Sequence, residues 1–163
     1  HRVCVDTLAM FAKGEGVLSG DSSAFTFLTH AETELNEFVA SRPFRVNAGA
    51  VHAYIFLPDD RTAYLSEIAG GQEVLAVAHD GKTRSVVVGR AKQEVRPMLK
   101  ISAEAEGRQG SIFLQNAETI CLTRPDGGPV SVVDLKIGDQ VLCRLDEAGR
   151  HFGRRIAENI AEV

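Results

Sequence analysis

The sequence lacks the features of a nucleic-acid-binding protein. It has no tryptophan and only two tyrosines, so the aromatic platforms on which unpaired bases stack are scarce. Its 22 acidic residues outnumber its 18 basic residues, which gives a net charge of -4. A general nucleic-acid binder needs a basic face that neutralises phosphates. We therefore expect no nucleic acid among the partners of this chain.

Cysteines and long apolar runs are also scarce. The three cysteines, Cys4, Cys121 and Cys143, are widely spaced and form no CxxC pair, which argues against a disulfide framework or a zinc knuckle. No apolar run approaches the roughly 20 residues of a membrane-spanning helix. The first residues do not resemble a signal peptide. These features predict a cytoplasmic protein with no membrane partner.

The common cofactor and catalytic motifs are missing from the sequence. We find no phosphate-binding loop, no HExxH, no GxSxG and no dinucleotide fingerprint. The turn Gly14-Glu15-Gly16 lacks the third glycine and the strand-to-helix context of a dinucleotide site. The sequence therefore assigns no residue to cofactor binding.

What the sequence does contain is a pattern that occurs three times. In each copy two apolar residues three positions apart precede a glycine, and Val-Leu follows the glycine; the glycines are Gly14, Gly71 and Gly138. Spacing of three suits a short helical turn, and glycine supplies a backbone conformation that is costly for other residues. Each copy therefore predicts a turn, a glycine corner and a strand. The alternative is that Gly-x-x-Val-Leu is a common way into a strand.

Short strand-like runs and regular turn signals, such as Asp80-Gly81, surround these copies. They predict a mainly β fold, made of repeated small barrel-like or sandwich-like β units with few short helices. Residues 1–41 would be the tail of a first unit, whose open sheet edge requires missing N-terminal residues or a partner chain. Residues 42–92 would form the second unit and residues 96–163 the third. A short helix is expected over residues 31–39.

The densest polar segment of the chain runs through residues 41–54. Arg42 and Arg45 can clamp a carboxylate or a phosphate, and the small residues beside Asn47 allow a ligand to approach the backbone. His52 can act as an acid, a base or a metal ligand. We interpret Arg42, Arg45 and Asn47 as substrate-binding and His52 as catalytic. The alternative is a pair of strands joined by a glycine bulge, with an incidental histidine.

Two further positions carry candidate chemistry. His30 and Glu32 lie two residues apart at a strand end, so their side chains share one face; we interpret both as catalytic, and His30 with His52 as ligands of a divalent metal. A histidine beside a carboxylate is also common as a surface pair. His151 follows a turn and is either substrate-binding or an ordinary hairpin residue. The candidates expected to line one cleft are His30, Glu32, Arg42, Arg45, Asn47 and His52.

The segment from Pro43 to Tyr54 resembles the corresponding segment of the type II 3-dehydroquinate synthases at nearly every residue. Further matching segments follow along the chain in the same order: Arg2–Thr7, Gly14–Gly16, Gly20–Ser23, His30–Thr33, Gln115–Thr119, Ser131–Asp139 and Arg150–Gly153. The resemblance covers essentially the whole chain and corresponds to the C-terminal half of the family's proteins.

This resemblance implies an enzyme of aromatic amino-acid biosynthesis. Members use NAD to deaminate an amino-heptulosonate oxidatively and then close the ring to give 3-dehydroquinate. The resemblance implies that NAD binding requires the N-terminal half, of α/β character, so this chain is expected to be incomplete as a catalyst. The arginines would hold the anionic substrate and the histidines would move protons in ring closure.

Other interpretations stay open at this point. A related branch makes 3-amino-4-hydroxybenzoate, and residues 21–26 are less glycine-rich than is usual in the family. The chain could instead be a non-catalytic β-barrel binding module, or a structural domain that completes a pocket in a partner chain. The sequence leaves the oligomeric state undecided.

Overall fold

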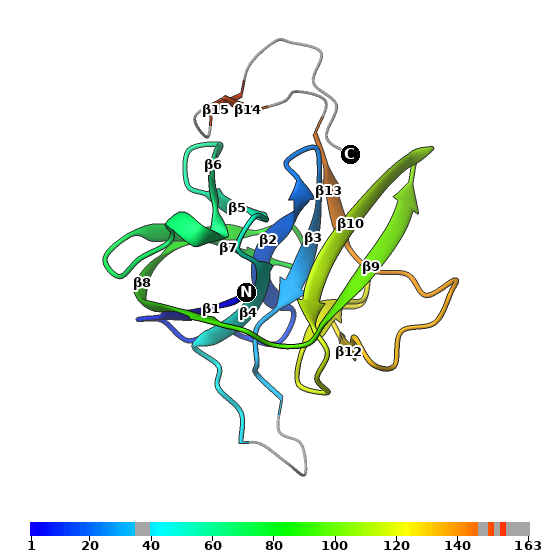
Figure 1. Ribbon diagram of the computed structural model, residues 1–163, viewed down its shortest axis with the longest axis horizontal. Helices are drawn as coiled ribbons and strands as arrows, with labels where there is room; N and C mark the ends of the chain where they lie inside the picture. The colour runs from blue at the N-terminus through cyan, green and yellow to red at the C-terminus, as the bar shows by residue number, and fades with distance from the viewer. Residues whose placement is uncertain (35–39, 147–149, 152–153, 156–163) are drawn as a thin grey trace.

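The computed structural model describes residues 1–34, 40–146, 150–151 and 154–155 (Figure 1). In these ranges the chain forms β-strands and one 3₁₀ turn, η1 (Leu65–Glu67), which confirms the predicted mainly β class. No helix among the described residues is long and apolar enough to cross a membrane. The strands are β1 (Arg2–Thr7), β2 (Glu15–Ser22), β3 (Phe25–His30), β4 (Arg45–Ala50), β5 (Tyr54–Leu57), β6 (Arg61–Tyr64), β7 (Glu73–Ala78), β8 (Thr83–Glu94), β9 (Met98–Ala105), β10 (Arg108–Gln115), β11 (Cys121–Thr123), β12 (Pro129–Ser131), β13 (Cys143–Leu145), β14 (Arg150–His151) and β15 (Arg154–Arg155).

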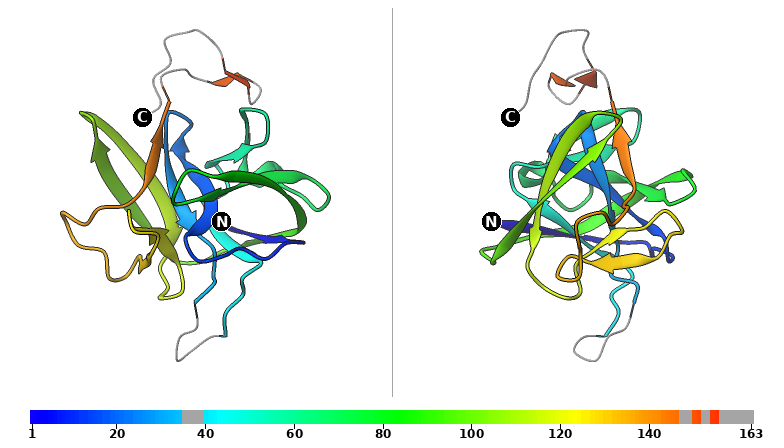
Figure 2. Two further views of the ribbon diagram at one scale, coloured as in Figure 1. Left: turned by 180° about the vertical axis from the view of Figure 1, so that it is seen from behind. Right: turned by 90° about the vertical axis from the view of Figure 1, so that its right-hand side faces the viewer.

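One curled sheet organises most of the chain. Its strand order is β12-β11-β3-β2-β7-β8-β1-β4. Off this path, β13 pairs with β3, β5 pairs with β2, and β6 pairs with β5. The long strand β8 pairs with β7 through its first half and with β1 through its second half, so it bends around the sheet (Figures 1 and 2). The β9–β10 hairpin forms a separate two-stranded sheet at the opposite side of the molecule from β7 and β8.

Alternating side chains explain how these layers pack. Val3 and Val5 of β1 and Val46 of β4 are completely buried in the main apolar core, so their strand neighbours face the other side of the sheet. The β9–β10 hairpin is also two-faced, and its Ile112 and Leu114 are completely buried in a second apolar core against β3. Burial of one face of each layer leaves a polar face on β1, β4 and β8 and another on the hairpin.

The three repeat glycines adopt the backbone conformation that the pattern predicts. Gly14, Gly71 and Gly138 have φ angles of 85°, 91° and 96°, in the left-handed region that other residues enter at a cost. In the second copy the predicted turn is η1, and strand β7 follows. In the third copy Val-Leu does not open a strand, because β13 begins only at Cys143. The glycine corner is therefore confirmed in all three copies, and the following strand in two.

The first two predicted units share one sheet. Strand β1 pairs with both β4 and β8, and β2 pairs with β7, so the strands of residues 1–41 find partners among those of residues 42–92. The division of the chain into units 1–41, 42–92 and 96–163 stays a prediction.

The helix predicted over residues 31–39 is wrong for its first part. The backbone of Glu32 donates to the carbonyl of Arg45 and accepts from Arg42, and these bonds hold Glu32 in a β-bridge with Arg42. A residue so paired across the chain cannot also close a helical turn. Residues 35–39 lie outside the described residues.

Candidate functional site

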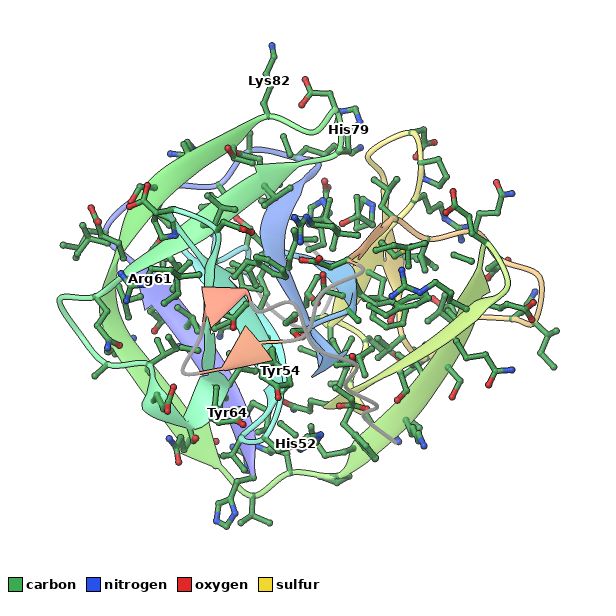
Figure 3. The ribbon with its side chains drawn as sticks, turned by 90° about the horizontal axis from the view of Figure 1, so that it is seen from above. His52, Tyr54, Arg61, Tyr64, His79 and Lys82 are labelled. Atoms are coloured by element: carbon green, nitrogen blue, oxygen red, sulfur yellow. The ribbon has the colours of Figure 1, made fainter. Side chains whose placement is uncertain are left out.

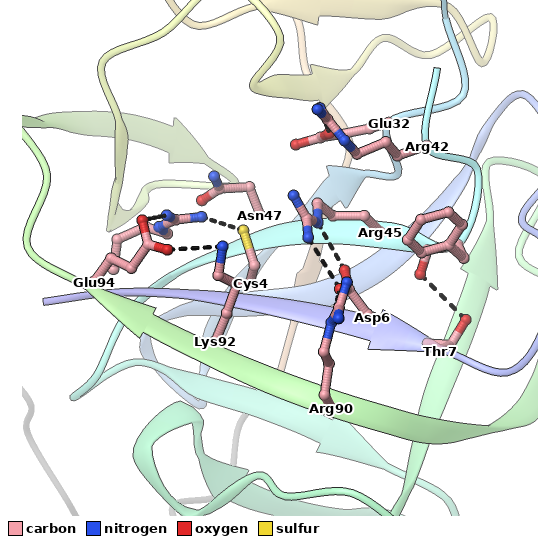
Figure 4. Close-up of polar contacts among 12 residues, drawn as sticks. Cys4, Asp6, Thr7, Glu32, Arg42, Arg45, Asn47, Arg90, Lys92 and Glu94 are labelled. Atoms are coloured by element: carbon pink, nitrogen blue, oxygen red, sulfur yellow. Dashed lines mark hydrogen bonds and ion pairs between the residues drawn. The ribbon is translucent and has the colours of Figure 1, made fainter. Parts of the chain in front are cut away.

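A charged cluster covers the polar face of strands β1, β4 and β8. Strand β1 lies between the other two, and the register places Asp6 between Arg45 and Arg90, and Cys4 between Asn47 and Lys92. Six cations pair with three carboxylates here, although the chain as a whole is acidic. We call this group the basic cluster (Figure 4); its charged residues are Arg2, Arg42, Arg45, Arg90, Lys92, Arg96, Asp6, Glu32 and Glu94.

Asp6 is the anchor of the basic cluster. Arg45 donates from Nε and Nη2 to its two carboxylate oxygens at 2.7 and 3.0 Å, and Arg90 donates from Nε at 2.6 Å. The Asp6 side chain is 6% exposed. Burial opposes its ionisation, but the hydrogen bonds and charges of the two arginines outweigh burial and lower the pKa of Asp6. The hydrogen bond to Asp6 raises the pKa of Arg45, so this pair is charged and fixed in place.

Glu32 lies on the other side of Arg45 and is bound differently. Its carboxylate contacts Nη1 of Arg42 at 3.6 Å, and its side chain is only 9% exposed. Burial raises the pKa of Glu32, although the charges of Arg45 and Arg42 oppose that shift. A carboxyl group whose pKa lies above its ordinary value can both take up and release a proton closer to neutral pH. Burial and the two arginines thus act on the Glu32 carboxyl in opposite directions.

The far end of the cluster contains buried polar atoms with unused bonding capacity. Arg2 donates from Nη2 to Glu94 at 2.8 Å and from Nη1 to the sulfur of Cys4, while its Nε has no partner among the described residues. Asn47 donates to Gln115 of β10 at 2.9 Å, and its Oδ1 is likewise unpartnered there. Buried polar groups are rarely left unpaired in proteins, so this end of the cluster suits a polar ligand.

The structure brings four of the predicted site residues together and separates the others. Glu32, Arg42, Arg45 and Asn47 all lie in or beside the basic cluster. His52 lies beyond the end of β4, where its Nε2 is 2.8 Å from Asp21. The backbone of His151 forms part of β14, and its side chain lies outside the described residues. The catalytic and substrate-binding roles assigned to these residues remain predictions.

His30 is held by the backbone through both of its ring nitrogens. Nε2 accepts a hydrogen bond from the backbone N–H of Gly14 at 2.9 Å, so Nδ1 carries the proton and donates to the carbonyl of Ala31 at 2.7 Å. The ring is buried, and burial lowers the pKa of His30, although the bond to Ala31 opposes that shift. Neither nitrogen remains for a metal ion.

The predicted metal site shared by His30 and His52 is therefore wrong. His30 pairs with Gly16 at the start of β2, whereas His52 bonds Asp21 at the end of that strand, which places them about 17 Å apart along the strand. Figure 3 shows His52 on the opposite side of the molecule from His79, which bonds to Gly14 beside His30. In the described part of the chain no three metal-binding side chains meet.

Comparisons with known proteins identify the family of this chain. Residues 1–163 match the family model described as the 3-dehydroquinate synthase II C-terminal domain. The chain belongs to this family. It is 56% identical over 161 residues to a 3-dehydroquinate synthase homolog of Aquifex aeolicus, and 53% identical over 161 residues to a 3-dehydroquinate synthase of Methanococcus maripaludis.

These alignments cover 99% of the chain but only 49% and 45% of the two relatives. The chain thus spans about half the length of the curated relatives that it matches. No solved structure matches it. The geometry of the site in this family domain is therefore taken from the fold described above.

Sequence reasoning missed several residues of this family domain's basic cluster. Asp6 and Arg90, the anchor and its exposed partner, were not among the candidates. The available signal was alternation: Arg2, Cys4 and Asp6 occupy every second position of a strand, with Val3 and Val5 between them, and two-residue periodicity places such residues on one face. The pairing of that face with β4 and β8 is a tertiary contact, which the alternation alone does not predict.

The buried neutral state of His30 predicts a pH dependence of stability. Between the lowered folded pKa and the ordinary value of 6.5, the unfolded state binds more protons than the folded state, so stability rises with pH. The contribution is complete above about 6.5 and is lost as the pH falls through that window. We expect acidification from about pH 7.5 to about pH 5 to destabilise the wild type more than His30→Gln, measured by urea unfolding. Equal losses in both proteins would contradict the buried neutral state.

Proposed function

We propose that this domain binds the anionic substrate of a 3-dehydroquinate synthase and supplies an acid–base group for ring closure. The substrate in this proposal is an amino-heptulosonate, which is deaminated oxidatively with NAD and closed to 3-dehydroquinate. One observation carries the proposal. Six cations and three carboxylates form the basic cluster in a chain whose net charge is -4, and such a local excess of positive charge attracts a carboxylate.

Arg90 and Arg42 are the arginines available to a ligand. Among the described residues Arg90 bonds Asp6 only through Nε, and its side chain is 64% exposed. Arg42 is 40% exposed and only loosely paired with Glu32. Arg45, in contrast, is committed to Asp6 through two nitrogens. In the proposed complex the substrate carboxylate binds the free guanidinium edges of Arg90 and Arg42, while Arg45 positions Asp6.

Glu32 is the proposed acid–base group. Ring closure by an aldol step removes a proton from the carbon beside a carbonyl, forms a carbon–carbon bond and places a proton on the oxygen of the attacked carbonyl. Glu32 lies between Arg42 and Arg45, next to the proposed carboxylate site. Its raised pKa allows it to accept the first proton as a carboxylate and to return a proton as an acid.

NAD would be the oxidant of the deamination. The described residues do not form a site that suits NAD. Binding of its diphosphate commonly uses a glycine-rich turn at a helix N-terminus, and the described ranges contain strands and a single 3₁₀ turn. We therefore assign NAD to the half of the enzyme that this chain does not include. No step through NAD is assigned to the residues described above.

Removing the exposed arginine should weaken substrate binding. In the two-domain enzyme we expect Arg90→Ala to raise KM for the amino-heptulosonate about tenfold with kcat changed less than about twofold, because it removes binding that substrate and transition state share. Lys82→Ala is the matched control, since Lys82 is an exposed cation in the β7–β8 turn. Steady-state kinetics followed by NADH absorbance measures both constants. An unchanged KM in Arg90→Ala would refute the proposed carboxylate site.

Removing the proton-transfer group should have the opposite kinetic signature. We expect Glu32→Gln to lower kcat about 100-fold with little change in KM, because general acid–base catalysis contributes about 10²–10⁴-fold. The amide keeps the shape and can still accept from Arg42, so folding should be retained. Formation of 3-dehydroquinate and release of ammonia are measured separately. Loss of ammonia release with normal ring closure of the deaminated intermediate would show that Glu32 serves the other half-reaction.

A further inference from the structure

A second polar site lies outside the basic cluster, between the β9–β10 hairpin and the end of β2. It is a groove of about 580 Å³ whose other wall contains Asp21 and His52. The apolar side chains of the hairpin, such as Ile112 and Leu114, are buried in the core, so alternate residues turn their polar side chains to the groove. We call it the hairpin groove; the hairpin residues used below are Lys100, Ser102, Glu104, Ser111 and Phe113.

Asp21 organises the groove by joining its two walls. One carboxylate oxygen is 2.8 Å from Nε2 of His52 and the other accepts from the hydroxyl of Ser111 at 2.7 Å. A carboxylate only accepts hydrogen bonds, so Nε2 carries a proton and both neighbours donate to Asp21. The ring of His52 is also held edge-on against Phe113, with centroids 5.7 Å apart. His52 and Ser111 are thus fixed in orientation before any ligand binds.

The two groups that donate to Asp21 also carry acceptor atoms, and both residues line the groove. In the neutral ring of His52, Nδ1 is an acceptor, and no described residue bonds to it. The hydroxyl oxygen of Ser111 keeps lone pairs of its own, and Ser102 lies directly opposite it across the hairpin. A ligand that matches this middle part of the groove must bring hydrogen-bond donors, as a polyol does.

Opposite charges mark the two ends of the groove. Lys100 and Glu104 lie on the same face of β9, four residues and about 13 Å apart, which is too far for them to pair with each other. Neither forms an ion pair with another described residue, and the Lys100 ammonium lies over the Phe113 ring, 5.9 Å from its centroid. The groove therefore offers a free cation at one end and a free carboxylate at the other.

From this geometry we propose that the hairpin groove binds a polyhydroxylated monocarboxylate. Lys100 pairs with the ligand carboxylate, and the ligand hydroxyls donate to Nδ1 of His52, to Ser111 and, at the far end, to Glu104. The site goes beyond the carboxylate site proposed at the basic cluster. The hairpin groove uses different residues. Arg45 begins β4, whereas His52 of the groove lies beyond the other end of that strand. The ligand of the groove is inferred from the donors and acceptors of the groove itself.

The test uses three small probes that separate the two kinds of contact. Gluconate carries hydroxyls and a carboxylate, sorbitol carries hydroxyls alone, and hexanoate carries a carboxylate alone. We expect gluconate to bind the 163-residue chain at least about tenfold more tightly than either other probe, measured by titration of backbone amide NMR signals. The shifted amides should be those of Asp21, His52 and Ser111. If gluconate binds no better than hexanoate, or leaves these amides unshifted, the proposal is wrong.

Variants assign the contacts and separate this site from the basic cluster. Lys100→Met should reduce gluconate affinity about tenfold and leave sorbitol unaffected. Asp21→Asn should weaken both, because one of the two oxygens that accept from His52 and Ser111 becomes an NH2 group, which only donates. Asp80→Asn, in an exposed turn, is the matched control. The NMR spectrum of each variant reports whether it is folded. Shifts confined to Arg45, Asn47 and Arg90 would show that gluconate binds the basic cluster and would overturn the proposed site in the hairpin groove. Shifts confined to the groove would support the proposed site, and they are independent of the catalytic role proposed for the basic cluster.

Discussion

Replacing Asp6 by asparagine is expected to lower the free energy of unfolding by about 3–5 kcal/mol. The amide cannot carry the charge that compensates Arg45, whose side chain is 15% exposed and donates to both carboxylate oxygens. Removing one partner of a buried ion pair leaves the other charge uncompensated, and that penalty is larger than the loss of a hydrogen bond. Denaturant unfolding followed by circular dichroism measures the change.

The control for this substitution is Asp80→Asn. Asp80 lies in the exposed β7–β8 turn, 3.8 Å from Lys82, and its amide counterpart can still accept from the backbone of Lys82. Surface substitutions of this kind change stability by less than about 0.5 kcal/mol. If Asp6→Asn behaved like Asp80→Asn, the charge of Asp6 would not matter to the fold.

Asp6→Asn should also change how the stability of the domain responds to acid. The arginines lower the folded-state pKa of Asp6 below its ordinary value of 3.8, so the folded state binds fewer protons in the window between the two values. The contribution of Asp6 is complete above about 3.8 and is lost as the pH falls through the folded pKa. The wild type should therefore lose stability more steeply than Asp6→Asn in that acidic window.

Gly16→Ala is expected to destabilise the domain by about 3 kcal/mol or more, or to prevent folding. A Cβ atom at this position would lie 1.8 Å from the backbone oxygen of Thr29 in the neighbouring strand β3. Gly16 pairs with His30 on one side and Val77 on the other, so its strand cannot move away without breaking a ladder. Because the obstacle is backbone, no side-chain rotation relieves it, and overpacking of this kind costs about 1–3 kcal/mol or more.

Gly81→Ala provides the contrast in the same protein. Gly81 has a φ of 90°, but no atom lies within 4 Å of the position that its Cβ would take. The cost should therefore be that of the left-handed backbone alone, about 1 kcal/mol. Unfolding midpoints of the two variants measure the difference. A loss for Gly81→Ala as large as that for Gly16→Ala would show that backbone conformation, rather than strand contact, governs both positions.

Local sequence patterns predicted the local structure of this domain well. The repeated glycines marked corners in which a left-handed backbone is required, and all three have positive φ angles. Asp80-Gly81 predicted the turn that joins β7 to β8. These features depend on a few adjacent residues, so the sequence contains the information directly. The helix expected from residue 31 failed in its first part because distant backbone partners hold Glu32. The third Val-Leu lies directly before β13 instead of inside it.

The candidate site was predictable only in part, for the same reason. The dense polar segment after residue 41 identified Arg42, Arg45 and Asn47, which the fold does place in or beside the basic cluster. It did not distinguish an arginine locked to Asp6 from one that is free to bind. The predicted pairing of His30 with His52 was wrong because the two residues lie at opposite ends of β2. The sequence shows that each lies near a strand end, but it does not show which strand ends meet.

The sequence by itself determined the β class, the glycine corners and the family, because these depend on residue types and on their order along the chain. Only the tertiary structure decided which charges meet. Asp6 and Arg90 are 84 residues apart in the chain, and Ser111 and Asp21 are 90 apart, so strand register and packing bring them within hydrogen-bonding distance. Registers of this kind are fixed by burial of the opposite face of each strand, and that burial is a property of the whole fold.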